Sequence, residues 1–196
     1  MGQAKIRRQA QAALGALPKD QIAEAVRASA GTAHTGICLH QAVVGQRVLR
    51  RFGLDTVLIA GDFRRPIGDG YQHTYTRDDG RISARTGAFH AWLQSPRTGE
   101  IIDFGAWEAP ARMEAEAGVS WTGPRPAFLW ESEAALRRQG YTVMPDAEAT
   151  ALVRRWEACS AGSSNDPEAA MFARFGDAAF IDACEARAVE MLSFGQ

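Results

Sequence analysis

Cys38, His90 and Asp103 are three residues whose side chains can together perform nucleophilic chemistry. In such a set the thiol attacks a carbonyl carbon, the imidazole acts as general base and acid, and the carboxylate orients the imidazole and stabilises its positive charge. Each residue also has a purely structural interpretation, because a lone cysteine is more often a small buried hydrophobe and a strand histidine often belongs to the core. Their order along the chain, on a predicted helix and then a predicted hairpin, favours the catalytic interpretation.

His90 and Asp103 lie on either side of one predicted turn. The residues around His90 alternate as a strand does, the Pro and Gly of "SPRTGE" are typical of a hairpin loop, and a second strand follows. A loop over 96–99 would set Trp92 opposite Asp103 and leave His90 diagonal to it, whereas a loop over 96–97 would set His90 directly opposite. Both registers predict that His90 and Asp103 share one face of the sheet, about 5 to 8 Å apart. Trp92, on the same face, would either line the site or pack in the core.

Cys38 is predicted to lie in the first turn of a helix. Thr35 is a suitable N-cap for this helix, and Gly53 is the residue type that best tolerates the left-handed conformation past its end. The positive end of the helix dipole lies at the first turn and favours a thiolate there. At about 100° per residue, one arc of the helix is predicted to point inward: Cys38, Ala42, Gly45, Val48, Leu49 and Phe52. The opposite, outward arc holds His40, Arg47, Arg50 and Arg51.

The rest of the chain is predicted to form helices at both ends and strands in the middle. Apolar residues at helical spacing, with Asp146 and Asp166 as N-caps, predict these helices: 3–15, 19–29, 131–140, 146–161, 166–177 and 178–192. Apolar β-branched or alternating runs predict these strands: 55–63, 71–76, 88–94, 100–105, 127–130 and 141–144. Residues 106–126 are rich in Pro and Gly and are predicted to be irregular, apart from one or two helical turns at 111–118. This order predicts an α+β fold.

Length and composition predict a globular protein with a single domain over residues 1–196. The chain is 46% hydrophobic and 23% charged, which is ordinary for a globular domain. Its formal net charge of -1 gives no electrostatic reason to bind nucleic acid or an anionic membrane surface. We find no apolar run long enough to span a bilayer and no secretion signal at the start, so we expect a cytoplasmic protein. The sequence does not indicate an oligomeric state.

Neither a metal ion nor a cofactor is expected. The three cysteines, Cys38, Cys159 and Cys184, are odd in number and widely spaced, which argues against a disulfide framework and against a zinc site. Cys159 and Cys184 lie at helical spacing with apolar neighbours and are interpreted as core residues. The histidines outside the hairpin do not have the spacing of a metal site: His34, His40 and His73.

Residues 36–105, a little over a third of the chain, resemble the papain-like superfamily in its transglutaminase-like branch. The similarity lies in the nucleophile helix, the strand after it and the two hairpin strands: Gly36, Cys38, Ala42, Leu49, Phe52-Gly53-Leu54, Val57, Gly61, His90-Ala91-Trp92-Leu93, Gly99, Ile101-Ile102 and Asp103. A small bacterial family of unassigned function within this superfamily is similar as well. The resemblance implies a papain-like fold, with a nucleophile helix packed on an antiparallel sheet and with helical N- and C-terminal segments.

The resemblance also implies a role for each matching residue. Cys38 would be the nucleophile, His90 the general base and acid, and Asp103 the group that orients His90. The substrate would be a peptide or a small amide or acyl compound, and no cofactor would be required. The backbone amide of Cys38 would supply one donor of an oxyanion hole, and His34 or Gln41 is a candidate for the second donor.

Three functions are consistent with this sequence. The favoured one is a cysteine-dependent hydrolase or acyltransferase that forms a thioester on Cys38. The main alternative is a catalytically silent papain-like domain that binds a partner or serves as a scaffold, and accessibility of Cys38 would distinguish the two. Acetyl transfer from acetyl-CoA would use the same three residues, although no segment predicts a nucleotide site. Leu39 follows the cysteine, where many transglutaminases have an aromatic residue, which argues against transglutaminase activity itself.

Overall fold

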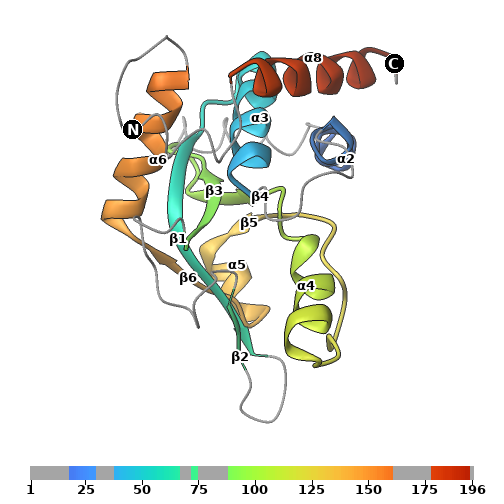
Figure 1. Cartoon of the computed structure of the whole chain (residues 1–196), viewed down its shortest axis with the longest axis vertical. Helices are drawn as coiled ribbons and strands as arrows, with labels where there is room; N and C mark the ends of the chain where they lie inside the picture. The colour runs from blue at the N-terminus through green and yellow to red at the C-terminus, as the bar shows by residue number, and fades with distance from the viewer. Residues whose placement is uncertain (1–17, 30–37, 67–71, 75–87, 161–177, 195–196) are drawn as a thin grey trace, which may run out of the picture.

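An antiparallel β-sheet forms the centre of the computed structural model, which describes residues 18–29, 38–66, 72–74, 88–160 and 178–194 (Figure 1). The strands are β1 Val57–Pro66, β2 Gln72–Thr74, β3 His90–Gln94, β4 Glu100–Asp103, β5 Leu129–Ser132 and β6 Thr142–Pro145. They are ordered β2-β1-β3-β4-β5, and β6 pairs with β1. All pairings among these strands are antiparallel, and the long strand β1 contacts three of the others.

Helices cover the sheet on both faces (Figure 1). They are α2 Lys19–Ser29, α3 Cys38–Arg51, α4 Glu108–Ala117, α5 Glu133–Arg138, α6 Ala147–Ser160 and α8 Ala178–Phe194. One face is covered by α3 on β3 and by α6 on β1. Helices α2 and α8, from opposite ends of the described chain, pack against each other and against α3. The predicted α+β class is therefore confirmed.

Alternation of side chains along the strands produces a core on each face of the sheet. Leu58 of β1 pairs with Leu93 of β3, and both belong to the core that α3 and α6 cover. The alternate positions Phe63, Trp92 and Ile101 belong to a second core, to which α4 and α5 contribute. Because residues two apart share a face, His90 lies on the side of this second core.

Several elements begin or end at the residues that the sequence predicts. Gly53 follows α3 with φ of 73°, and Gly99 closes the β3–β4 loop with φ of 75°. Oδ1 of Asp146 accepts a hydrogen bond from Ala149 N at 2.7 Å, which confirms it as the N-cap of α6. The predicted strands all coincide with observed strands to within a few residues. The predicted helices 3–15 and 166–177 lie outside the described residues, as do Thr35 and Asp166.

Helix α3 is buried on more sides than its own pattern predicts. His40, assigned to the outward arc, is only 8% exposed. Its ring lies edge-on to Trp156 of α6 at 6.3 Å and to Phe180 of α8 at 5.6 Å between ring centres. Phe52, assigned to the inward arc, is 39% exposed. Two helices from the C-terminal half cover His40, whereas Arg50 and Arg51 of the same arc are exposed as predicted. The pattern within α3 gives no sign of these two helices.

The region 106–126 contains more helix than predicted. Helix α4 occupies Glu108–Ala117, where only one or two turns at 111–118 were expected. Pro110 lies in the first turn of the helix, where a missing backbone N–H costs no hydrogen bond, so it does not prevent the helix from forming. Gly118 then ends the helix with φ of 64° in the left-handed region.

A Gly45→Ala substitution tests how closely α3 packs on Phe104. Gly45 faces the ring of Phe104, and a Cβ added at this glycine would lie 2.2 Å from Phe104 Cε2. Alanine in place of glycine normally stabilises a helix interior by about 1 kcal/mol. Here we expect a loss of about 1–3 kcal/mol in the free energy of unfolding because of overpacking, measured by urea denaturation.

The matched control is the same substitution in a Phe104→Ala background, where the ring is gone. In that background Gly45→Ala is expected to be neutral or stabilising. A neutral or stabilising effect in the wild-type chain as well would contradict the close packing of α3 on Phe104.

Candidate functional site

His90 and Asp103 are joined by a hydrogen bond across the β3–β4 hairpin. Ser95 N donates to Glu100 O at 2.9 Å, which closes the loop over 96–99. This is the first of the two predicted registers, and it leaves His90 diagonal to Asp103. Nε2 of His90 lies 2.8 Å from Oδ2 of Asp103. The prediction that the two residues share one face is therefore confirmed.

Both oxygens of the Asp103 carboxylate have hydrogen-bond partners. Oδ2 accepts from His90, and Oδ1 accepts from Gly105 N at 2.8 Å. Asp103 is 1% exposed and His90 is 3% exposed, so water does not compete for either side chain. A charged acceptor of this kind requires a proton on Nε2, which leaves Nδ1 as the second ring nitrogen. The carboxylate thereby sets both the orientation and the tautomer of the imidazole.

Two aromatic rings flank the His90 imidazole. The ring centre of Phe63 lies 5.6 Å away with the planes at 88°, an edge-to-face contact. Trp92 is stacked at 6.3 Å with the planes at 23°. Trp92 is only 1% exposed, so it packs in the core and also borders the site through its contact with His90. These contacts limit rotation of the imidazole away from Asp103.

Cys38 is the first residue of α3 and is partly exposed. A Cβ added at Gly105 would lie 3.3 Å from both Cα and Cβ of Cys38 and 3.4 Å from Oδ1 of Asp103. A side chain at position 105 would press on the start of α3 and on the carboxylate together. Gly105 thus allows the helix to begin beside the end of β4. Sequence reasoning missed this residue, although an Asp two positions before a Gly at a strand end is typical of a turn in which the carboxylate accepts from the backbone.

The electrostatics of the site depend on all three predicted residues. Burial by itself lowers the pKa of His90, because it disfavours the charged imidazolium. The negative charge of Asp103 and the hydrogen bond to its carboxylate, together with the interaction with the Cys38 side chain, act in the opposite direction and outweigh burial. Together they raise the pKa of His90 from 6.5 to about 10. His90 therefore interacts with Cys38 as well as with Asp103, and it is cationic at neutral pH.

The other predicted candidates are distributed as follows. Gln41 lies one turn after Cys38 and is 1% exposed, and its carboxamide has no hydrogen-bond partner among the described residues. Cys184 is fully buried and burial raises the pKa of its thiol, which confirms it as a core residue. His34 lies outside the described residues, as do the side chains of His73 and Cys159.

Two further findings concern the described part of the chain. In these ranges no group of three or more His, Cys, Asp or Glu side chains is arranged to hold a metal ion. None of the helices there combines the length and the apolar character that crossing a bilayer requires.

Comparisons with known proteins identify a fold. No protein-family model matches this sequence, and no curated protein matches it significantly. A solved structure described as "The crystal structure of genomics APC5867" is similar to this chain with a TM-score of 0.51 and 18% sequence identity. The similarity covers 87% of this chain and 76% of the other. At this identity the similarity shows a shared fold and not a shared function.

An Asp103→Asn substitution tests the charge of the His90–Asp103 pair. Asparagine keeps an acceptor but removes the negative charge that favours the imidazolium. Because the folded-state pKa of His90 is raised, its contribution to stability is complete below pH 6.5 and is lost as the pH rises through about 10. We expect Asp103→Asn to lower the free energy of unfolding by about 1–3 kcal/mol at pH 6, and the deficit to shrink as the pH approaches 10, in urea denaturation series.

Asp182→Asn is the control for this measurement. Asp182 is 67% exposed in its ion pair with Arg47 at 2.6 Å. Loss of that exposed pair should change stability by less than about 1 kcal/mol across the same pH range. No deficit for Asp103→Asn, or a deficit that does not vary with pH, would contradict a charged His90–Asp103 pair.

Proposed function

We propose that this protein is a cysteine-dependent hydrolase or acyltransferase of papain-like type, with Cys38 as nucleophile, His90 as general acid and base, and Asp103 as the orienting group. The observation that supports this most strongly is the position of the His90 imidazole, which is bonded to Asp103 through Nε2 and interacts with Cys38. An imidazolium beside a sulfur favours the thiolate, which is the nucleophilic form of cysteine. The chemistry requires no metal ion and no cofactor.

In the acylation step, Sγ of Cys38 attacks the carbonyl carbon of an amide or ester, and a C–S bond forms. The proton that the thiol has lost resides on His90. His90 donates this proton to the leaving nitrogen or oxygen as its bond to the carbonyl carbon breaks. The step yields a thioester on Cys38 and a neutral amine or alcohol.

In the deacylation step, water or a second nucleophile attacks the thioester. Nδ1 of His90 accepts the proton of the incoming nucleophile, because Nε2 already donates a hydrogen bond to Asp103. The C–S bond breaks, so the thiolate of Cys38 and the imidazolium of His90 are restored together. Attack by water gives hydrolysis, and attack by an amine or alcohol gives acyl transfer.

Asp103 acts through His90 in both steps. Its negative charge stabilises the imidazolium each time His90 is protonated, and its hydrogen bond to Nε2 leaves Nδ1 available for proton transfer with the sulfur. The hydrogen bond from Gly105 N to Oδ1 keeps the carboxylate in place. A carboxylate that accepts a hydrogen bond at each oxygen does not need to reorient between steps, which is the benefit of preorganisation.

The papain-like architecture is part of this proposal. Helix α3 begins at Cys38 and packs on β3, the strand that contains His90. Helices α2 and α8 lie at the two ends of the described chain. This agrees with the expectation of a nucleophile helix on an antiparallel sheet with helical terminal segments.

A papain-like domain that binds a partner without catalysis is the second candidate. The burial of His90 and Asp103 to 3% and 1% exposure favours it, because such a pair can also serve only to stabilise a hairpin. Cys38, in contrast, is partly exposed, as a nucleophile has to be. Reactivity of the Cys38 thiol separates the two candidates.

Cys38→Ala is expected to abolish hydrolysis of p-nitrophenyl acyl esters and of peptide anilides by the purified protein. The expected fall in kcat/KM is at least about 1000-fold, because no thioester can form. Cys159→Ala and Cys184→Ala are the matched controls and are expected to retain activity, since neither thiol belongs to the proposed site. Activity that survives in Cys38→Ala would overturn the proposal.

Alkylation with iodoacetamide provides a second measurement that needs no substrate. In the native protein, Cys38 is expected to react at least about 10-fold faster than Cys184, whose thiol is buried and has a raised pKa. Mass spectrometry of the digested protein distinguishes the two sites. If native Cys38 reacts no faster than the same thiol in urea-unfolded protein, the binding-domain alternative is favoured instead.

A further inference from the structure

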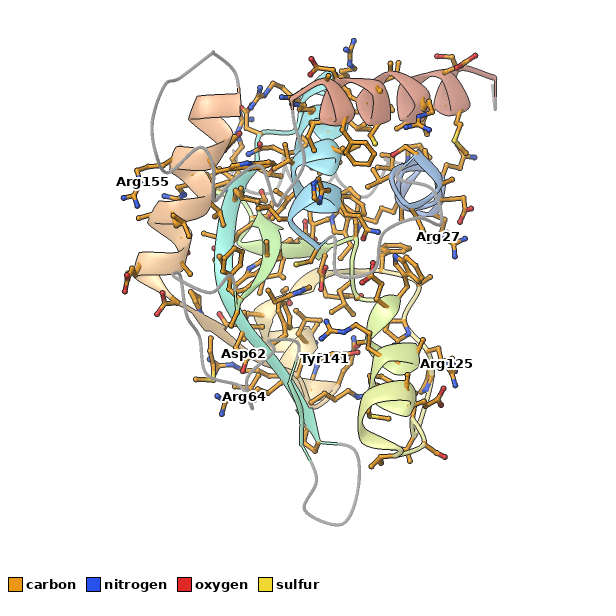
Figure 2. The ribbon with its side chains drawn as sticks, viewed as in Figure 1. Arg27, Asp62, Arg64, Arg125, Tyr141 and Arg155 are labelled. Atoms are coloured by element: carbon orange, nitrogen blue, oxygen red, sulfur yellow. The ribbon has the colours of Figure 1, made fainter. Side chains whose placement is uncertain are left out.

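Arg65 lies near the end of β1, two residues beyond Phe63 and on the same face of the sheet. The centre of its guanidinium lies 4.6 Å from the ring centre of Trp121 and 5.4 Å from that of Tyr141. In Figure 2, Tyr141 lies between β1 and α4, on the side of the second core. Contacts of this length are cation–π contacts, and two of them confine the guanidinium.

The turn after α4 packs closely against this guanidinium. Nε1 of Trp121 donates to Pro124 O at 3.2 Å, which fixes the indole against its own turn. Gly123 has φ of 91°, and a Cβ added there would lie 3.0 Å from Nη2 of Arg65. A bare backbone at position 123 therefore permits the close approach of the guanidinium. These features give the Arg65 side chain a defined position rather than a free one.

Arg65 differs from nearby arginines because no acidic group of the described chain neutralises it. Nε of Arg64, the next residue back along β1, donates to the buried Asp62 at 2.7 Å, and both lie on the other side of β1 in Figure 2. Arg125 donates to Glu114 at 2.6 Å, so the carboxylate near the turn is already paired. Within the described residues, Arg65 makes ring contacts and no hydrogen bond or ion pair.

The guanidinium of Arg65 is half-buried, and within the described residues its N–H groups donate no hydrogen bond. The rings of Trp121 and Tyr141 lie against the group, and neither accepts a conventional hydrogen bond from it. The N–H donors of arginine form a rigid planar fork that matches two oxygens of a carboxylate or phosphate. We propose that Arg65, clamped by Trp121 and Tyr141, is the binding site for a small oxyanion, either a carboxylate or a phosphate group.

This anion site is separate from the Cys38 site. Gly61 of β1 pairs with His90, and four residues of strand carry the chain about 13 Å from Gly61 to Arg65. Phe63 lies between them and is fully buried, and Tyr141 is 4% exposed. An oxyanion on Arg65 would not contact His90, so the anion site holds whether or not Cys38 is catalytic.

The test is an NMR titration of the full-length, nitrogen-15-labelled protein with acetate and with inorganic phosphate, at constant ionic strength set by chloride. We expect saturable shifts of the Trp121 indole N–H and the Gly123 amide. The affinity should fall at least about 10-fold in Arg65→Gln, which loses the charge and the planar fork. Arg138→Gln is the matched control, because Arg138 is an exposed arginine at the end of α5.

Each outcome of this titration supports or overturns the proposal. Tighter binding of phosphate identifies a phosphate ligand, and tighter binding of acetate identifies a carboxylate ligand. Absence of saturable shifts, or equal shifts in wild type and Arg65→Gln, overturns the site. If Arg65→Gln does not give the dispersed spectrum of a folded protein, Arg65→Lys takes its place. Affinity for the anion equal to wild type in Arg65→Lys would contradict recognition by the planar guanidinium.

Discussion

The buried hydrogen bond between His90 and Asp103 is the constraint on which the rest of the site depends. Away from water, the carboxylate and the imidazolium each require the other, because an unpaired charge in such a place is costly. The loop over 96–99 sets the register that makes the bond possible. A slip of β3 against β4 by one residue would move the two side chains to opposite faces of the sheet. The same bond thus links strand register to the orientation of the imidazole.

Two glycines bring the nucleophile helix to this pair. Gly45 lies against the ring of Phe104, and Gly105 lies against the backbone and Cβ of Cys38. Phe104 and Gly105 directly follow Asp103 along the chain. The end of β4 and the turn after it therefore supply three things in consecutive residues. These are the carboxylate of Asp103, the Phe104 ring on which α3 packs, and the space at Gly105 for the start of α3. The position of Cys38 relative to His90 follows from this short segment.

The parts of the site that could be predicted from the sequence are those with local signals. Turn residues at 96–99 and the alternation around His90 were sufficient to assign it and Asp103 to one face, although two registers remained possible. Burial of His40 could not be predicted, because α6 and α8 cover it and both lie far along the chain. The position of the Arg65 side chain could not be predicted for the same reason, because the rings that contact it come from separate later segments. Long-range packing of this kind leaves no periodicity in the segment that it covers.

An NMR titration of the His90 ring nitrogens tests the account most directly, because it reports the charge that Asp103 and Cys38 stabilise. We expect the wild-type imidazole to remain protonated through neutral pH and to titrate with a pKa of about 10. In Cys38→Ala the pKa of His90 should fall, because the interaction with the sulfur is removed while the hydrogen bond to Asp103 remains. A wild-type pKa near 6.5 that does not change in Cys38→Ala would contradict the account.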